Sequence, residues 1–375
     1  VAEYNEVNGY WIHNSTNATL LYNSANNNYG DGIFQSDSLN GNISFNEVLY
    51  NERNGIHVTN STGKSLICNV VKGNKESGII VDSSTDLVLD CNWVEDNKGP
   101  GISVINSPNN LLNNNTAINN SDGFYLFQSD NTTISNSTAS DNANNGLNIA
   151  YTNNVTIFND TITNNSENGI YLNHSTLVNI TGSTISGNTL SGIELDESNQ
   201  VNIIDNNMSY NEKSGLTLNN TSDINVIRNN ASYNGLCGLS FENVTRLNIT
   251  DNIVTYNELC GICMDNSEDN VISGNNASYN KLSGINLTNS SGNSLTDNIA
   301  FNNSANGIYL SNSSNGNDIN DNIVGYNNQS GILIEDSSQN NLTNNTAYGN
   351  GQAGFSLVNT SHTNVNDSVS YGNDV

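Results

Sequence analysis

Apolar and polar residues alternate in short runs along the whole chain, and the runs recur at a fixed interval. A glycine followed by an apolar residue marks each repeat, and thirteen of the fifteen intervals between successive glycines are 23 residues. These glycines are Gly9, Gly32, Gly55, Gly78, Gly101, Gly123, Gly146, Gly169, Gly192, Gly215, Gly238, Gly261, Gly284, Gly307, Gly331 and Gly354. Such regularity is typical of a solenoid, and it excludes the disordered chain that low hydrophobicity and high charge would otherwise indicate.

Three apolar runs lie in each repeat when the repeats are aligned on this glycine. Apolar residues stand one, three and eleven positions after it, as in Ile193, Leu195 and Ile203, and a smaller one follows at sixteen, as in Met208. Alternation within a run is typical of a strand with one buried face. One 23-residue coil cannot bury its apolar face alone, but stacked coils share an interior. We therefore predict an all-β, right-handed, single-stranded parallel β-helix solenoid of about 16 coils with three short strands each, forming one domain over 1–375 without linkers or obvious caps.

Asparagine forms two further columns and is the source of an unusual composition, with 84 asparagines among 375 residues. One column stands fourteen residues after the glycine, as in Asn206 and Asn229, and the other stands nineteen after it, as in Asn211 and Asn234. Asparagine tolerates left-handed backbone, and stacked amides can donate to one another's carbonyl oxygens. We predict that both columns are asparagine ladders at the corners of the coils.

The repeat unit resembles a known one. Its pattern G-[IL]-x-[LV]-x-x-[ST], then x-[IV]-x-x-N, then N-x-x-[SN]-G, is similar to the right-handed parallel β-helix repeat of the periplasmic copper-site maturation type and of surface proteins of methanogenic archaea. The resemblance covers essentially all of 1–375, and it is greatest to archaeal surface-layer or sheath proteins. It implies the fold rather than the function, because the family includes pectinases, lyases, epimerases, adhesins and cell-envelope proteins.

The charge of the chain excludes two classes of partner. Nine Lys and Arg residues against 36 Asp and Glu give a formal net charge of −27. Nucleic acids and anionic membrane surfaces both require cationic side chains, so neither is an expected partner. No apolar run is long enough to predict a membrane span.

Cysteines and glycosylation sequons indicate an oxidising, extracellular compartment. Cys68 and Cys91 occupy one column on adjacent coils, as do Cys237 and Cys260, so we predict two disulfides or, alternatively, pairs of buried thiols. Cys263 is left as a free thiol or an intermolecular cross-link. Outer turns carry Asn-x-Ser/Thr sequons, which we predict as possible glycosylation sites: Asn14, Asn60, Asn131, Asn173, Asn220, Asn243, Asn289, Asn312 and Asn359.

Two surface columns are candidates for chemistry. Asp196, Glu242 and Asp265 stand four residues after the glycine and are weak candidates for Ca²⁺ binding or for paired acid and base groups, against a simple solvated surface. Tyr210, Tyr233, Tyr256 and Tyr279 form a column that could stack against sugar rings, although stacking on one another is favoured. The repeats carry no long inserted loop, so we predict no catalytic residues, no cofactor beyond possible structural Ca²⁺, and no enzymatic activity.

The function that these observations favour is structural. Both ends of the sequence stop within a coil, without a capping segment, and uncapped strand edges pair readily with another chain. We predict a self-assembling component of a sheath, surface layer or filament that stacks head to tail with itself. The alternatives are a secreted protein that binds or degrades a polysaccharide, with surface glycans as partners, and a module of an adhesin.

Overall fold

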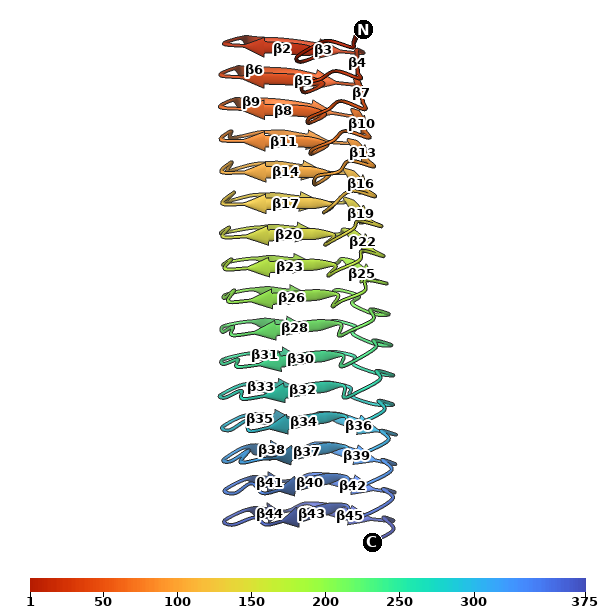
Figure 1. Cartoon of the computed structure of the whole chain (residues 1–375). Helices are drawn as coiled ribbons and strands as arrows, with labels where there is room; N and C mark the ends of the chain where they lie inside the picture. Colours follow the sequence, from red (N-terminus) through yellow and green to blue (C-terminus); the bar gives the residue numbers. More distant parts are fainter. The chain divides into compact units, whose positions relative to one another are not determined.

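The computed structural model describes all of residues 1–375. It contains 45 β-strands joined by turns and no helix, so no helix is long and apolar enough to cross a membrane. The strands stack in parallel on three sides, as predicted for a right-handed β-solenoid of about 16 coils. Two compact units are formed by Val1–Thr189 and Leu190–Val375. Figure 1 shows the coils of each unit stacked in sequence order. The single-domain organisation stays a prediction.

The first unit forms three parallel sheets, one on each side of the coils. The first side contains β2 (Tyr10–His13), β5 (Ile33–Ser36), β8 (Ile56–Thr59), β11 (Ile79–Asp82), β14 (Ile102–Ile105), β17 (Phe124–Phe127), β20 (Leu147–Ala150) and β23 (Ile170–Asn173). The second contains β3 (Thr16–Leu21), β6 (Leu39–Ser44), β9 (Thr62–Ile67), β12 (Val88–Asp90), β15 (Leu111–Asn113), β18 (Thr133–Ser135), β21 (Thr156–Phe158) and β24 (Asn179–Thr181). The third contains β1 (Ala2–Glu3), β4 (Ser24–Asn26), β7 (Glu47–Leu49), β10 (Val70–Lys72), β13 (Trp93–Glu95), β16 (Thr116–Ile118), β19 (Thr138–Ser140), β22 (Thr161–Thr163) and β25 (Thr184–Ser186).

The second unit repeats the first two sides but has a shorter third sheet. Its first side contains β26 (Ile193–Asp196), β28 (Leu216–Asn219), β30 (Leu239–Glu242), β32 (Ile262–Asp265), β34 (Ile285–Thr288), β37 (Ile308–Ser311), β40 (Ile332–Glu335) and β43 (Phe355–Val358). Its second contains β27 (Asn202–Ile204), β29 (Asn225–Ile227), β31 (Asn248–Thr250), β33 (Val271–Ser273), β35 (Ser294–Thr296), β38 (Asp318–Asn320), β41 (Asn341–Thr343) and β44 (Asn364–Asn366). Its third contains only β36 (Ile299–Phe301), β39 (Ile323–Gly325), β42 (Thr346–Tyr348) and β45 (Val369–Tyr371).

The predicted apolar columns form the core of both units. Ile193, Leu195, Ile203 and Met208, which represent the four columns, are each 0% exposed. Neighbouring coils align in register, so that Leu218 of β28 pairs with Phe241 of β30, and each apolar residue packs on its counterpart in the next coil. Every strand therefore needs only one or two inward apolar residues, which explains how a chain that is 34% hydrophobic forms a continuous core.

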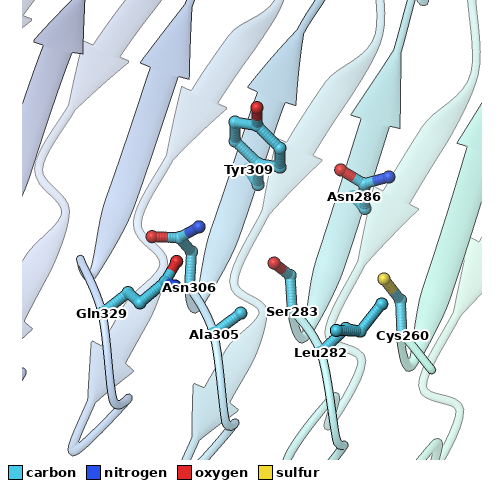
Figure 2. A pocket seen from close by; sticks show the side chains of 8 residues that line it. All are labelled: Cys260, Leu282, Ser283, Asn286, Ala305, Asn306, Tyr309 and Gln329. Carbon is cyan, nitrogen blue, oxygen red and sulfur yellow. The ribbon is translucent and has the colours of Figure 1, made fainter. Parts of the chain in front are cut away.

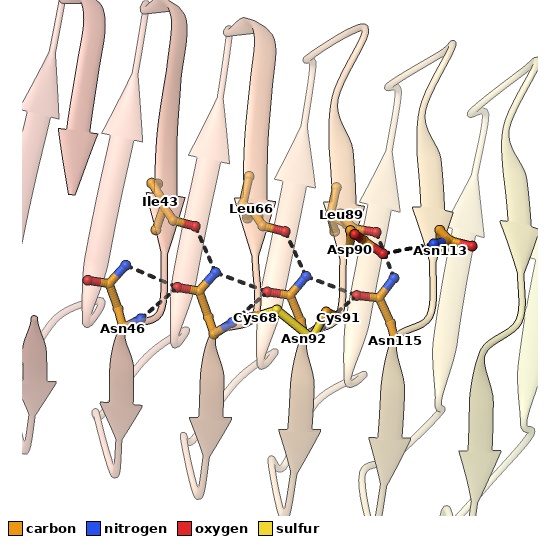
Figure 3. Close-up of a disulfide and its surroundings, with 11 residues drawn as sticks. Ile43, Asn46, Leu66, Cys68, Leu89, Asp90, Cys91, Asn92, Asn113 and Asn115 are labelled. Atoms are coloured by element: carbon orange, nitrogen blue, oxygen red, sulfur yellow. Dashed lines mark hydrogen bonds between the residues drawn. A yellow bond between two sulfur atoms is a disulfide. The ribbon is translucent and has the colours of Figure 1, made fainter. Parts of the chain in front are cut away.

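The two asparagine columns form ladders, as predicted. In the first unit, the side-chain nitrogen of Asn69 donates to the side-chain oxygen of Asn92 at 2.9 Å and to the carbonyl oxygen of Ile43 at 2.8 Å. The backbone N–H of Asn69 donates to the same oxygen of Asn92 at 3.0 Å. Figure 3 shows this pattern repeated from coil to coil. Each buried amide thus satisfies backbone groups that a corner would otherwise leave without partners.

The ladder asparagines do not themselves occupy the left-handed region, which corrects the expectation from sequence. The residue before each one does so instead, as in Asp205 (φ 57°) before Asn206 and Tyr210 (φ 62°) before Asn211. The bend thereby turns the following asparagine inward, where it is buried. Side chains with a positive φ, tyrosine included, project outward from the corner.

Two further ladders were missed by the sequence analysis. Serine and threonine six residues after the glycine stack between the first and second sides, so that the N–H of Ser61 donates to Ser84 Oγ at 3.0 Å and Ser61 Oγ donates to the Thr59 carbonyl at 2.8 Å. In the second unit, Asn270 and Asn293 belong to a third asparagine ladder, in which the Asn270 amide donates to Asn293 Oδ1 at 3.0 Å. Both columns were present in the sequence as regularly spaced polar residues.

Candidate functional site

Two carboxylates meet on the outer face of the first side of the second unit. Glu242 ends β30 and Asp265 ends β32, and the two residues pair directly in register on neighbouring parallel strands. Their side chains are exposed, because residues two and four positions after the glycine point away from the core. They line a hollow of about 280 Å³ together with Ser240, Phe241, Cys263, Met264, Asn286 and Thr288.

A second hollow of about 220 Å³ lies on the C-terminal side of the first and shares Asn286 with it. Its other lining residues are Cys260, Leu282, Ser283, Ala305, Asn306, Tyr309 and Gln329. Figure 2 shows Asn286 and Tyr309 beside Cys260, Ser283 and Asn306, with all five side chains drawn at this hollow. We refer to the two hollows together as the groove. It extends over β30, β32, β34 and β37.

Asn286 lines both hollows, and the oxygen of its side-chain amide has no hydrogen-bond donor. Its side-chain nitrogen donates to Thr288 Oγ1 at 3.3 Å, whereas its Oδ1 is buried and has no hydrogen-bond partner. A buried acceptor without a donor costs roughly 1–3 kcal/mol. Such an atom indicates a place where a donor from solvent or from a ligand completes the site.

Tyr309 closes the far end of the groove. Its hydroxyl donates to Glu335 Oε2 at 2.7 Å. Glu335 lies on the next coil, in the column four residues after the glycine. Burial and this hydrogen bond to a carboxylate both raise the pKa of Tyr309. The tyrosine therefore stays protonated at neutral pH and presents its ring, rather than a charge, to the groove.

Asp196 does not join the other two predicted acids. It lies at the end of β26, two coils before Glu242, and Asn219 of β28 lies between them in the same column. No group of three or more His, Cys, Asp or Glu side chains is arranged to hold a metal ion. Calcium binding by these acids stays a prediction.

The disulfides differ from the predicted pairs. Cys68 and Cys91 are joined as expected, with Cα atoms 4.4 Å apart (Figure 3). Cys237, however, is joined to Cys263 rather than to Cys260, and Cys260 is a buried free thiol. The predicted pairing of Cys237 with Cys260 is therefore wrong, and so is the prediction that Cys263 is the unpaired thiol. Burial raises the pKa of Cys260 to about 11, so this thiol is protonated and unreactive at neutral pH.

The direction of the side chains explains the correction. A residue just before the marker glycine projects toward the residue two positions after the glycine of the next coil, which lies 26 residues later. The same diagonal joins Asp31 to His57, with Oδ2 and Nδ1 3.4 Å apart, and Ser191 to Thr217, with their oxygens 2.9 Å apart. Cys237 and Cys263 lie on this same diagonal. The 26-residue spacing of the other two pairs was a signal in the sequence for this disulfide.

The tyrosine column is a stack of rings. Successive centroids from Tyr210 to Tyr233 and from Tyr233 to Tyr256 lie 5.0 and 4.9 Å apart, with planes inclined by 2°. Tyr279 continues the stack at 4.9 Å. Neighbouring rings cover one another's faces, so sugar rings cannot stack on the inner members. The geometry supports the structural role of this column over glycan stacking.

The predicted glycosylation sites lie on outer turns. Eight of the nine asparagines are exposed and Asn173 is half-buried. Asn220 and Asn243 occupy the same corner on adjacent coils, where the Asn243 amide donates to Asn220 Oδ1 at 3.3 Å. Adjacent coils are only about 4.8 Å apart, so glycans on both asparagines would crowd one another. Glycosylation itself stays a prediction.

Several buried ionisable groups were missed by the sequence analysis, because each lies in a column whose other members are mostly uncharged. Burial alone would raise the pKa of Asp31, but hydrogen bonds from His57 and Asn54 outweigh it and hold that pKa below its usual value. Lys64, 1% exposed, donates to the Asn40 carbonyl, and burial lowers its pKa. Asp160 takes the place of a ladder asparagine, and burial raises its pKa to about 7.

The contacts of His13 do not form a Ser-His-Asp arrangement of the catalytic kind. The Nδ1 atom of His13 lies 3.0 Å from Ser36 Oγ and 3.2 Å from Asp37 Oδ2. A catalytic histidine contacts its serine through one ring nitrogen and its carboxylate through the other. Here a single nitrogen makes both contacts, so the ring cannot relay a proton from serine to the carboxylate side.

Comparison with known proteins agrees with this fold. The family model described as "Right handed beta helix region" matches residues 46–185, 122–269 and 214–370. The chain belongs to the right-handed β-helix family. Because the matches overlap and together extend over most of the sequence, the family covers both units. No curated protein matches the sequence.

Solved structures of similar fold include enzymes. The periplasmic alginate epimerase AlgG is 12% identical, covers 86% of this chain and 76% of its own, and has a TM-score of 0.46. The mannuronan C-5 epimerase AlgE4 A-module of Azotobacter vinelandii is 14% identical over 93% and 89%, with a TM-score of 0.43. DFA-IIIase from Arthrobacter chlorophenolicus A6 is 12% identical over 76% and 70%, with a TM-score of 0.41.

These structures contradict our prediction that the chain is not an enzyme. That prediction rested on uniform repeats and on short loops, and two epimerases are among the solved structures to which the chain is similar. At such identities the likeness concerns the fold alone and identifies no reaction for this protein.

Proposed function

We propose that this protein is an extracytoplasmic polysaccharide-binding protein and that the groove is where the polymer chain lies. The observation that carries the proposal is Asn286 Oδ1, a buried acceptor without a partner at the junction of two hollows. A sugar hydroxyl or amine supplies the missing donor. The remaining lining groups include carboxylate, hydroxyl and amide side chains, which are the usual partners of sugar donors and acceptors.

The form of the groove fits a linear polymer better than a small metabolite. Its two hollows are open at the surface and follow one another across four neighbouring coils, instead of forming one enclosed cavity. Each of the four coils contributes a residue of the same outward column, namely Ser240, Cys263, Asn286 and Tyr309, so successive sugar units would meet successive coils. Tyr309 offers a ring at one end and Glu242 a carboxylate at the other.

The compartment is consistent with such a ligand. Two disulfides persist only under oxidising conditions, which indicates a location outside the cytoplasm. Extracellular polysaccharides are present there. Attachment to a cell surface or sheath, the archaeal surface-protein resemblance and head-to-tail self-assembly stay predictions.

Binding and cleavage are tested together. Purified protein is run in affinity gels that contain neutral, anionic or amino polysaccharides, and the release of new chain ends from each polymer is measured in parallel. We expect retardation by at least one polymer, and Asn286→Ala together with Glu242→Gln should weaken it at least tenfold. The matched control is Asp297→Asn, an exposed acid in another column, which should bind as the unaltered protein does.

Two results would contradict the proposal. One is the absence of retardation by any polymer, with the two disulfides verified as intact. The other is retardation that the groove variant leaves unchanged, which would place binding on another surface.

A further inference from the structure

We infer that the polysaccharide carries N-acetyl groups and that the second hollow of the groove, the one that Tyr309 lines, binds one acetamido group of the polymer. This inference rests on the proposed function and names the class of polysaccharide. It is carried by two unused hydrogen-bonding atoms at this hollow, the side-chain nitrogen of buried Asn306 and the side-chain oxygen of Asn286.

Asn306 stands directly before a marker glycine, a position at which other asparagines use their side-chain nitrogen within the fold. The nitrogen of Asn54 donates to Asp31 Oδ1 on the preceding coil and to Glu76 Oε2 on the next coil, each at 3.0 Å. Asn145 makes the same two kinds of contact, at 3.3 and 3.0 Å. In these coils the amide is therefore held between two carboxylates.

Both carboxylates are replaced around Asn306. The corresponding residues are Ser283 on the preceding coil and Gln329 on the next, and both line the second hollow together with Asn306. Asn306 is 3% exposed and its Oδ1 accepts the N–H of Ser330 at 3.0 Å, which leaves its nitrogen as a donor without a partner. A buried polar group in this state indicates a place that a ligand or solvent completes.

The unused donor and the unused acceptor belong to successive coils and lie at the same hollow. Figure 2 shows the nitrogen of Asn306 and the oxygen of Asn286 both turned toward Tyr309, with the Ser283 hydroxyl between them in this view. A trans secondary amide presents its N–H and its carbonyl oxygen on opposite sides. One acetamido group can therefore donate to Asn286 and accept from Asn306 and from the Ser283 hydroxyl.

Apolar groups line the same hollow beside these polar atoms. Leu282 and Ala305 lie in one column on successive coils, and Cys260 contributes a buried thiol. A protonated cysteine packs as a small apolar side chain. The methyl of an acetyl group removes water from these surfaces when it packs against them, which favours binding.

Other sugar substituents complement the hollow less well. A carboxylate would meet the Asn286 oxygen, and no Lys, Arg or His lines this hollow. An ammonium group would meet the Asn306 nitrogen, and no Asp or Glu lines it either. A hydroxyl group satisfies the two amides but offers Leu282 and Ala305 no apolar surface.

The test compares ligands that differ in the acetyl group. Binding of N-acetylglucosamine and N-acetylgalactosamine oligomers to the intact protein is measured by calorimetry, each beside its deacetylated form and beside glucose oligomers of equal length. We expect at least one acetylated oligomer to bind at least tenfold more tightly than its deacetylated form and than the glucose oligomer. An extended peptide, which carries secondary amides without sugar hydroxyls, should not bind.

Two variants assign the preference to this hollow. Ala305→Leu fills it with the residue that the same column carries on the three preceding coils, and it should lower the affinity for the acetylated oligomer at least tenfold. Asn306→Asp keeps the acceptor for the Ser330 N–H but removes the donor, and it should abolish the preference. The matched control is Gln352→Leu, in the same column but outside the hollow, which should retain it.

Three results would overturn the inference. One is equal binding of acetylated and deacetylated oligomers, another is peptide binding as tight as that of the oligomers, and the third is an acetyl preference that survives in both Ala305→Leu and Asn306→Asp. Peptide mapping of the two disulfides verifies the fold of each variant. The proposed function stands in each case if Asn286→Ala together with Glu242→Gln weakens polymer binding, whereas binding of no polymer at all rejects both.

Discussion

The third side of the coils is built in two ways, and the two units show the difference. In the first unit the third apolar run of each coil forms a regular strand, and these strands make a nine-stranded sheet from β1 to β25. In the second unit the coils between Asn206 and Tyr279 replace that strand with single bridges, such as Asn207 with Asn230 and Ile253 with Asn276. Regular strands resume only at β36.

Hydroxyl side chains replace the missing backbone bonds. The N–H of Ser232 donates to Ser209 Oγ at 3.2 Å, and the N–H of Thr255 donates to Ser232 Oγ at 3.3 Å. Ser209 and Ser232 are 1% and 2% exposed, so these side chains point inward. In the first unit the equivalent residues Leu49 and Lys72 lie partly exposed on the outer face of their strands.

The stacked tyrosines belong to this second design. The residue after each inward hydroxyl takes a positive φ and projects its ring outward, as at Tyr233 (φ 59°). Cross-coil ring stacking then compensates for part of the lost ladder. The comparison teaches that a 23-residue coil can be closed by backbone pairing or by side-chain pairing with nearly the same geometry.

The corner asparagine ladder is interrupted in the first unit, whereas the third side of the coils is irregular in the second unit. The column fourteen residues after the glycine runs unbroken through the second unit from Asn206 to Asn345. In the first unit it is interrupted by Ser137, Asp160 and Ser183, where backbone N–H groups still find an oxygen but no amide is present to donate onward. The variants below test whether each defect carries the cost that its geometry predicts.

Asp160→Asn should produce the largest change. The pKa of Asp160 is raised from 3.8 to about 7 in the folded chain, and Oδ2 has no partner. Above pH 7 the buried charge therefore lowers the free energy of unfolding by about 4 kcal/mol. We expect the asparagine variant to be more stable by that order at pH 8, measured by denaturant unfolding.

The sign follows from proton linkage. The folded state of the natural chain holds its proton up to a higher pH than the unfolded state does, so its stability falls as the pH rises from about 4 to 7. The gain from Asp160→Asn should accordingly shrink toward pH 4. A gain independent of pH would show that Asp160 titrates normally.

Asn252→Ala should cost about 3 kcal/mol, because one amide serves several buried groups in the unbroken ladder. Its nitrogen donates to the Val226 carbonyl at 2.8 Å and to Asn275 Oδ1 at 2.9 Å, and its oxygen accepts from the N–H of Asn229 at 2.9 Å. Hydrogen exchange of the Asn229 amide is the local measurement. Ser183→Ala, at the interrupted corner of the first unit, should cost about 2 kcal/mol, because it removes only the acceptor of the Asp160 N–H.

Ser232→Ala should cost about 2 kcal/mol, since it leaves the N–H of Thr255 without an acceptor. The matched variant is Ser140→Ala in β19, where backbone pairing with neighbouring strands satisfies the coil and the hydroxyl is not needed. We expect the second variant to lie within about 0.5 kcal/mol of the natural protein by denaturant unfolding. Equal costs would refute the side-chain role in the second unit.

Tyr256→Ala should cost more than Tyr279→Ala by about 1 kcal/mol, the smallest effect of the set. Tyr256 stacks on Tyr233 and on Tyr279, whereas Tyr279 stacks on Tyr256 alone. Thermal unfolding of the two variants measures the difference. If both variants bind polysaccharide normally, the column has no part in ligand recognition.

The coil and its interior could be read from the sequence because periodicity determines which residues share a column. The inward positions of Leu195 and Ile203 and the ladder of Asn229 followed from spacing alone. The third asparagine ladder through Asn270 could have been found in the same way. The single bridges near Ser232 also had a signal, since the repeated pattern N-x-x-[ST]-Y-N occurs only there.

The site could be predicted only in part. Spacing placed Glu242 and Asp265 in one column, and the structure brings them together. It did not show that Asn286 joins two hollows or that its oxygen has no donor, because that depends on how side chains of different columns lean toward one another. The exclusion of enzymatic activity failed because regular repeats constrain the fold and not its chemistry.

The sequence by itself determined the length of the coil, the columns of the core and the ladders at the corners. These depend on spacing along the chain, and in-register stacking converts spacing directly into contact. Only the tertiary structure decided that Cys237 joins Cys263 and that the groove is formed between columns. Such diagonal contacts depend on the direction of each Cα–Cβ bond and on the offset between coils, which the 23-residue period leaves open.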